Sequence, residues 1–163
     1  MLKNRNIIIV LVIFTMAIGI LSSSYATGKD RKISELKAQI LLDDAWADIK
    51  KSFGLQAKLK NYKALEFEQF NDFMQGKIEG FDNKELCSEL IAEFIEVNKE
   101  IPIGTTIPKI FVKNKPLEMI IAYKDENGVN TLEILQDNNG KWDHEKMSAK
   151  GKPLLNYNSI KIE

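Results

Sequence analysis

His144 is the only imidazole in the sequence, and histidine is the side chain that most often exchanges protons near neutral pH. Strand alternation places His144 on one face with Trp142, while Asp143 and Glu145 point to the other face. A histidine that acts as a general base needs an acid to orient it. Because its own strand offers none, the pattern favours an exposed histidine, and an enzyme centred on His144 would need an acid from another strand.

Cys87 is the only thiol, so the chain cannot form an internal disulfide. One cysteine and one histidine are also too few for a zinc site with the usual ligands. Helical spacing places Cys87 on one apolar stripe with Leu90, Ile91 and Phe94. We expect a small core residue, because free cysteine is among the most buried residue types; a reactive thiol, or a link to another chain, is the alternative.

Two acidic turns, residues 125–128 and 137–140, have the composition of calcium loops but not their pattern. A calcium-binding EF-hand loop needs oxygen ligands at alternating positions and a closing glutamate, and neither turn supplies that series. The sequence also lacks serine hydrolase motifs and phosphate-binding glycine loops. We therefore expect no cofactor, no metal and no enzyme of a recognisable motif class.

An N-terminal export segment is the clearest signal in the chain. Lys3 and Arg5 precede a charge-free apolar run, residues 7–21, and small residues follow it up to Ala26. A basic head, an apolar middle and a small-x-small end describe a secretory signal peptide, which we expect to span residues 1–26 and to be cut before Thr27. The alternative is an uncleaved membrane anchor, since about 20 apolar residues span a bilayer.

Both alternatives place the rest of the chain outside the cytoplasm, in the periplasm or secreted, because the positive end stays inside. No cysteine follows the apolar run, so a lipoprotein is excluded, and the absence of an N-x-Ser/Thr sequon favours a bacterial source. Equal numbers of basic and acidic side chains argue against a nucleic-acid partner. Membrane contact is expected only through residues 7–26, if they are not removed.

Residues 27–163 have the length of a single exported domain. Its first half is patterned for about three helices. A stripe made of Leu42, Ala45, Trp46, Ile49 and Phe53 predicts the first helix, residues 30–53, with Asp48 largely outside the stripe. Residues 55–78 favour a second helix, although residues 63–70 alternate in part and leave a short strand open. Asp82 and Glu85 resemble a capping box for a third helix that must end before Pro102.

The second half is patterned for about four antiparallel strands. A first strand is expected at residues 110–112, a second at 117–124, and a last short strand near Ile160. Asn127-Gly128 and Asn139-Gly140 each separate strand-like runs, and Asn-Gly is the strongest short signal for a hairpin. Helices followed by a curled antiparallel sheet give an α+β fold.

The run from Tyr123 to Gly128, then Thr131 to Gln136, then Asp-Asn-Asn-Gly-Lys-Trp ending at Trp142 resembles the closing strands of nuclear transport factor 2-like, or cystatin-like, domains. That resemblance implies a bent sheet wrapped around a long N-terminal helix. It carries no chemistry, because the superfamily includes enzymes, binding modules and assembly factors.

These observations predict a non-enzymatic domain of the cell envelope that binds a protein partner or a small apolar ligand. A concave sheet would place Trp142, His144 and Tyr123 in a ligand pocket against the first helix, with Trp46 beside them or in the core. A membrane-anchored scaffold, similar to inner-membrane components of type IV secretion machinery, is the second hypothesis. The chain is basic over residues 27–65 and acidic over residues 66–100, which indicates either a charged docking surface or two solvated faces.

Overall fold

The computed structural model describes residues 28–162, so the predicted signal peptide or anchor lies outside the described residues. The chain divides into two compact units between Glu35 and Leu36, inside the first described helix. Of the first unit, the structure describes helical turns in which Arg31 Nε and Glu35 Oε1 pair at 2.9 Å. Within residues 28–162, no helix is long and apolar enough to cross a membrane. The second unit contains the sheet and the other helices.

Helix α2 (Gly28–Phe53) confirms the first predicted helix. The predicted stripe faces the sheet, with Ala45 and Ile49 buried and Trp46 stacked on Phe111 at 5.3 Å between ring centroids. Trp46 is therefore a packing residue. Gly54 follows with φ 60°, a left-handed backbone that glycine adopts without strain, and it turns the chain into α3 (Leu55–Lys58).

The single helix favoured for residues 55–78 is wrong. The segment is divided into α3, a 3-10 turn η1 (Leu59–Asn61), strand β1 (Lys63–Ala64), a second 3-10 turn η2 (Phe67–Gln69) and α4 (Phe70–Met74). Strand β1 pairs with Phe111 and Val112, so the alternative of a short strand here is confirmed. Pairing with the sheet outweighs helix propensity in this segment.

Helix α5 (Lys84–Lys99) confirms the third predicted helix and ends before Pro102. The whole predicted stripe, including Cys87, is buried. The predicted capping box is wrong in its residues, because the Asn83 side chain caps the helix by accepting a hydrogen bond from Leu86 N–H at 3.2 Å. A capping box occurs instead at η2, between Glu66 and Gln69.

The sheet is antiparallel and open, with its strands in chain order: β1, β2 (Lys109–Lys113), β3 (Glu118–Lys124), β4 (Val129–Asp137) and β5 (Trp142–Lys150). With four α-helices and these five strands in residues 28–162, the chain has the expected α+β fold. The strand predicted near Ile160 is absent from the described residues; this segment forms a 3-10 turn, η3 (Tyr157–Ser159), and Ile160 is buried.

The two predicted hairpins form, but their turns differ. Asn139 and Gly140 both have positive φ, as a two-residue Asn-Gly turn requires. In the first turn only Gly128 does, with Asp125 C=O accepting from Gly128 N–H. The second turn therefore sets the register of β4 with β5: Asn138 lies opposite Lys141, and each residue before Asn138 lies opposite the corresponding residue after Lys141.

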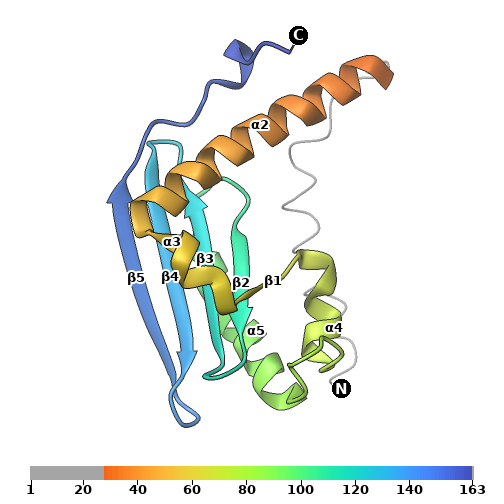
Figure 1. Ribbon diagram of the computed structural model, residues 1–163, viewed down its shortest axis with the longest axis vertical. Helices are drawn as coiled ribbons and strands as arrows, with labels where there is room; N and C mark the ends of the chain where they lie inside the picture. The colour runs from red at the N-terminus through yellow and green to blue at the C-terminus, as the bar shows by residue number, and fades with distance from the viewer. Residues whose placement is uncertain (1–27, 163) are drawn as a thin grey trace. The chain divides into compact units, whose positions relative to one another are not determined.

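Helices cover both faces of the sheet, as Figure 1 shows. On the α2 face, Ile49 and Leu55 pack on Ile120, Leu132 and Ile134. On the α5 face, the helix packs on the alternate residues of the same strands, among them Ile121, Tyr123 and Leu135. Trp46 therefore lies on the opposite face from Tyr123 and Trp142, so the predicted pocket that joins all three is wrong.

Candidate functional site

Two of the predicted ligand residues, Tyr123 on β3 and His144 on β5, meet at a residue that the sequence did not single out. Glu133 on β4, between those strands, accepts a hydrogen bond from the Tyr123 hydroxyl at 2.6 Å and lies 2.7 Å from His144 Nε2. Lys146 Nζ pairs with the same carboxylate at 3.1 Å. Trp142 lies half-buried at the edge of the α5 core and is not one of the described hydrogen-bond or ion-pair partners of Glu133. His144 thus has the acid from another strand that the enzyme hypothesis requires.

The Glu133 carboxylate is fully buried, whereas the side chains of His144 and Lys146 are 37% and 43% exposed. Burial alone would raise the pKa of Glu133, but hydrogen bonds from Tyr123, Lys146 and His144 outweigh it and hold that pKa below its usual value. Burial and the neighbouring carboxylate raise the pKa of Tyr123 to about 12. Glu133 is therefore an ionised buried acid that holds two exposed basic side chains on the surface of β5.

A second buried acid, Glu118, lies on the α2 face of the sheet. It accepts a hydrogen bond from the Tyr62 hydroxyl, and Lys113 Nζ lies 3.0 Å from its other oxygen. Lys113 Nζ also lies 5.0 Å from the centre of the Tyr62 ring, within the range of a cation–π contact. Burial and the nearby carboxylate raise the pKa of Tyr62, so its hydroxyl stays protonated and donates.

These three residues form part of the wall of a hollow of about 350 Å³ between α3–η1 and the sheet. The other lining residues are Lys58, Asn61, Ile134, Gln136 and Glu145. A concave site with a few convergent polar groups is the usual form of a small-molecule site.

A second hollow, of about 340 Å³, adjoins the start of α5 and includes Cys87. Burial raises the pKa of that thiol to about 11, which makes it a poor nucleophile.

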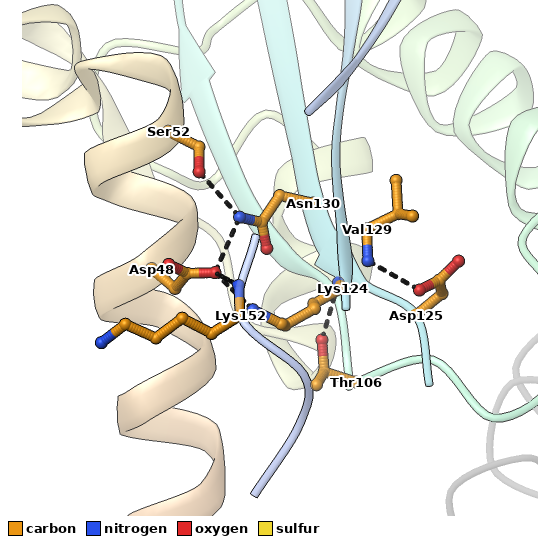
Figure 2. A network of polar contacts seen from close by, with 8 residues as sticks. All are labelled: Asp48, Ser52, Thr106, Lys124, Asp125, Val129, Asn130 and Lys152. Atoms are coloured by element: carbon orange, nitrogen blue, oxygen red, sulfur yellow. Dashed lines mark hydrogen bonds and ion pairs between the residues drawn. The ribbon is translucent and has the colours of Figure 1, made fainter. Parts of the chain in front are cut away.

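A third polar network, shown in Figure 2, joins α2 to the sheet and to the C-terminal segment. The Asp48 carboxylate pairs with Lys124 Nζ and accepts hydrogen bonds from Asn130 Nδ2 at 3.0 Å and from Lys152 N–H at 2.9 Å. Lys124 and Asn130 are both fully buried. A side chain at position 151 would overlap Asp48 and Asn130, so glycine is required there by close packing. This network ties α2 and the C-terminal segment to the ends of β3 and β4.

Acid should weaken this network. Burial alone would raise the pKa of Asp48, but its bonds from Lys124, Asn130 and Lys152 lower it from 3.8 to about 2. A carboxylate with a lowered pKa stabilises the fold above its unfolded value and loses that effect as the pH falls through the folded value. We expect the wild-type free energy of unfolding to fall by about 2 kcal/mol from this group between pH 4 and pH 2. Urea titrations of wild type and Asp48→Asn over that range measure it, and equal pH slopes would contradict the assignment.

Strand β5 forms an open edge of the sheet, since no described strand pairs with its outer side. Asn138 and Lys141 exchange both backbone hydrogen bonds, at 2.8 and 3.3 Å, and hydrogen-bonded pairs alternate from there along β4 and β5. Counting along this ladder shows which backbone groups face outward. The N–H and C=O groups that face outward belong to residues 142, 144, 146, 148 and 150.

In comparisons with family models, curated proteins and solved structures, nothing matches the chain. The resemblance to nuclear transport factor 2-like domains therefore stays a prediction.

Proposed function

We propose that this chain is a non-enzymatic domain of the cell envelope that binds a protein partner, and that the partner docks as an extended segment along β5. The observation that carries the proposal is the open edge, nine residues long, with outward backbone groups at every second residue. An added strand satisfies such groups directly, and its side chains provide specificity. Export rests on the N-terminal sequence pattern.

The charges on β5 favour a basic partner segment. On the α5 face, the basic side chains His144 and Lys146 are already engaged by Glu133. On the α2 face, Asp143 contacts only the amide of Asn138, at 3.1 Å, and Glu145 has no partner among residues 28–162. Lys150, at the end of the strand, is also exposed and forms no ion pair with the described residues, so the uncompensated charge is negative over residues 143–145. Opposite charges across a strand pair stabilise it, so lysine or arginine side chains would complement these acids.

A second copy of this chain fits the edge poorly when the antiparallel pair is centred on residues 144–146. Two antiparallel copies related by a two-fold axis must place one residue opposite itself. Centring the pair on His144 sets Asp143 opposite Glu145, while centring on Glu145 or Lys146 sets that charge opposite its own copy. Like charges directly opposite are destabilising. Charged side chains on an edge strand also protect against such self-association.

A basic peptide should therefore bind to β5. The probe is a synthetic peptide of about nine residues that alternates lysine with valine, matched to the strand period. On binding, we expect the backbone amides of residues 144, 146 and 148 to become protected from hydrogen exchange, because they then donate to the peptide. NMR exchange measurements on the folded domain detect this. A peptide with glutamate in place of lysine should bind at least about tenfold more weakly, and equal binding of both would contradict the proposal.

Ser148→Pro provides the matched variant. Proline removes an outward N–H and is tolerated on an edge strand, so the fold should persist while peptide binding is lost. Ala149→Pro removes an N–H that donates to β4 and should instead destabilise the sheet. If Ser148→Pro folds and still binds the peptide with wild-type affinity, the β5 edge is not the docking surface.

Two other functions stay open to test. A full-length protein in the membrane fraction, instead of a soluble one that begins at Thr27, would favour a membrane-anchored scaffold of a secretion complex.

The contact between Glu133 and His144 favours an enzyme, although His144 lines neither hollow described above. Turnover lost in a stable His144→Ala variant would support that enzyme. A small apolar ligand could use Trp142 and His144, but Tyr123 is buried.

A further inference from the structure

The hollow under α3 has paired charges in its interior and unpaired charges at its rim. Inside, Lys113, Tyr62 and Glu118 satisfy one another, at distances of 3.0 Å and 3.3 Å from Lys113 Nζ to the Glu118 carboxylate and the Tyr62 hydroxyl. Glu118 is only 7% exposed, and the strand pairing fixes its position opposite Lys113. This interior is a rigid polar wall with no net charge.

The rim offers one cation and one anion from opposite walls. Lys58 comes from α3, and Glu145 comes from β5. Although both line the same hollow, they form no ion pair with each other or with any other residue in the part of the chain that the structure describes. Asn61 and Gln136 line it as well, and their side-chain amides form no hydrogen bond with any residue between 28 and 162.

We propose that this hollow binds a small zwitterion, a free amino acid or short peptide that carries one ammonium and one carboxylate group. The carboxylate would pair with Lys58, the ammonium with Glu145, and the amides would bind the remaining polar atoms. A purely anionic ligand would face Glu145 without compensation, and a purely cationic one would face Lys58. The volume, about 350 Å³, lies at the lower end of the range for small-molecule sites.

The wild-type test uses the full folded domain and defined probes. Each common L-amino acid, and glycylglycine, is titrated to about 10 mM while the amide signals of residues 58–62 and 145 are followed by NMR. We expect at least one probe to shift these signals with saturation. Its N-acetyl and amide derivatives, which lack one of the two charges, should bind at least about tenfold more weakly. The absence of saturable binding by all probes would overturn the proposal.

Variants assign the two charges. Lys58→Gln and Glu145→Gln each remove one rim charge at similar size and should weaken zwitterion binding at least about tenfold. Lys60→Gln and Asp143→Asn are the controls, because these neighbouring charges do not line the hollow. Wild-type affinity in both rim variants would overturn the site. The side chain of Ser148 lies on the α5 face of the sheet, so Ser148→Pro should leave zwitterion binding unchanged. The β5 proposal and the zwitterion proposal can therefore fail independently of each other.

Discussion

Replacing Asp48 with alanine should destabilise the second unit by about 3–5 kcal/mol, the usual cost of removing one member of a buried ion pair. The Lys124 side chain, 1% exposed, would remain as a buried cation without its partner. Asn130 and the backbone of Lys152 would also lose an acceptor. The amide oxygen of Asn130 accepts no hydrogen bond from the described residues, but it is uncharged and so cannot replace the carboxylate as the counter-charge of Lys124.

Urea unfolding monitored by circular dichroism measures this effect. Asp44→Ala is the matched control, one helical turn earlier on α2, and should change the free energy of unfolding by less than about 0.5 kcal/mol. The double variant Asp48→Ala, Lys124→Met should recover part of the loss, because methionine fills most of the space of the lysine without its buried charge. An Asp48→Ala variant as stable as Asp44→Ala would show that α2 does not depend on this ion pair.

Replacing Lys146 with methionine should cost about 2 kcal/mol, the second largest effect that we expect. The Glu133 carboxylate would stay buried and lose its only lysine partner among residues 28–162, while Tyr123 and His144 still contact it. The cost is below that of a fully buried pair because the Lys146 side chain is 43% exposed and water screens part of the attraction. The pKa of Glu133 should rise toward or above its usual value, since Lys146 contributes to lowering it.

Lys150→Met is the control for this substitution. Lys150 lies on the same face of β5 and is exposed, so its replacement should change stability by less than about 0.5 kcal/mol. Thermal unfolding of both variants at neutral pH gives the comparison. A loss of equal size in the two variants would mean that general surface charge, and not the contact with Glu133, stabilises the strand.

Local signals predicted much of the fold. The apolar stripe of α5 and the proline after it define that helix, and the Asn139-Gly140 turn defines the last hairpin. These features depend on neighbours in the chain, which a sequence displays directly. The segment of residues 55–78 was misjudged because the pairing of β1 with β2, almost 50 residues away, decides its structure.

The contact between Glu133 and His144 was missed, although the sequence contained a signal for it. A two-residue turn at Asn139-Gly140 sets Glu133 opposite Lys146 and diagonal to His144, once the pairing is counted outward. Asp48 had no such signal. It falls outside the apolar stripe of α2, and only the docking of that helix on the sheet brings it to Lys124. Register can be counted from a turn, whereas the docking of a helix cannot.

The chain-order arrangement of the strands has a consequence for how the protein folds. Strands β2 to β5 follow one another closely in the sequence and pair in that order, so this part of the sheet can form by successive short loop closures, which are rapid. The pairing of β1 with β2 must instead close the long segment that contains α4 and α5. By contrast, Asp48 and Asn130 are separated by 82 positions, so the docking of α2 on the sheet must close a long loop and costs more conformational entropy than a hairpin does. We therefore expect the hairpins of β2 to β5 to form before α2 docks, so that the α2 face of the sheet is covered late in folding.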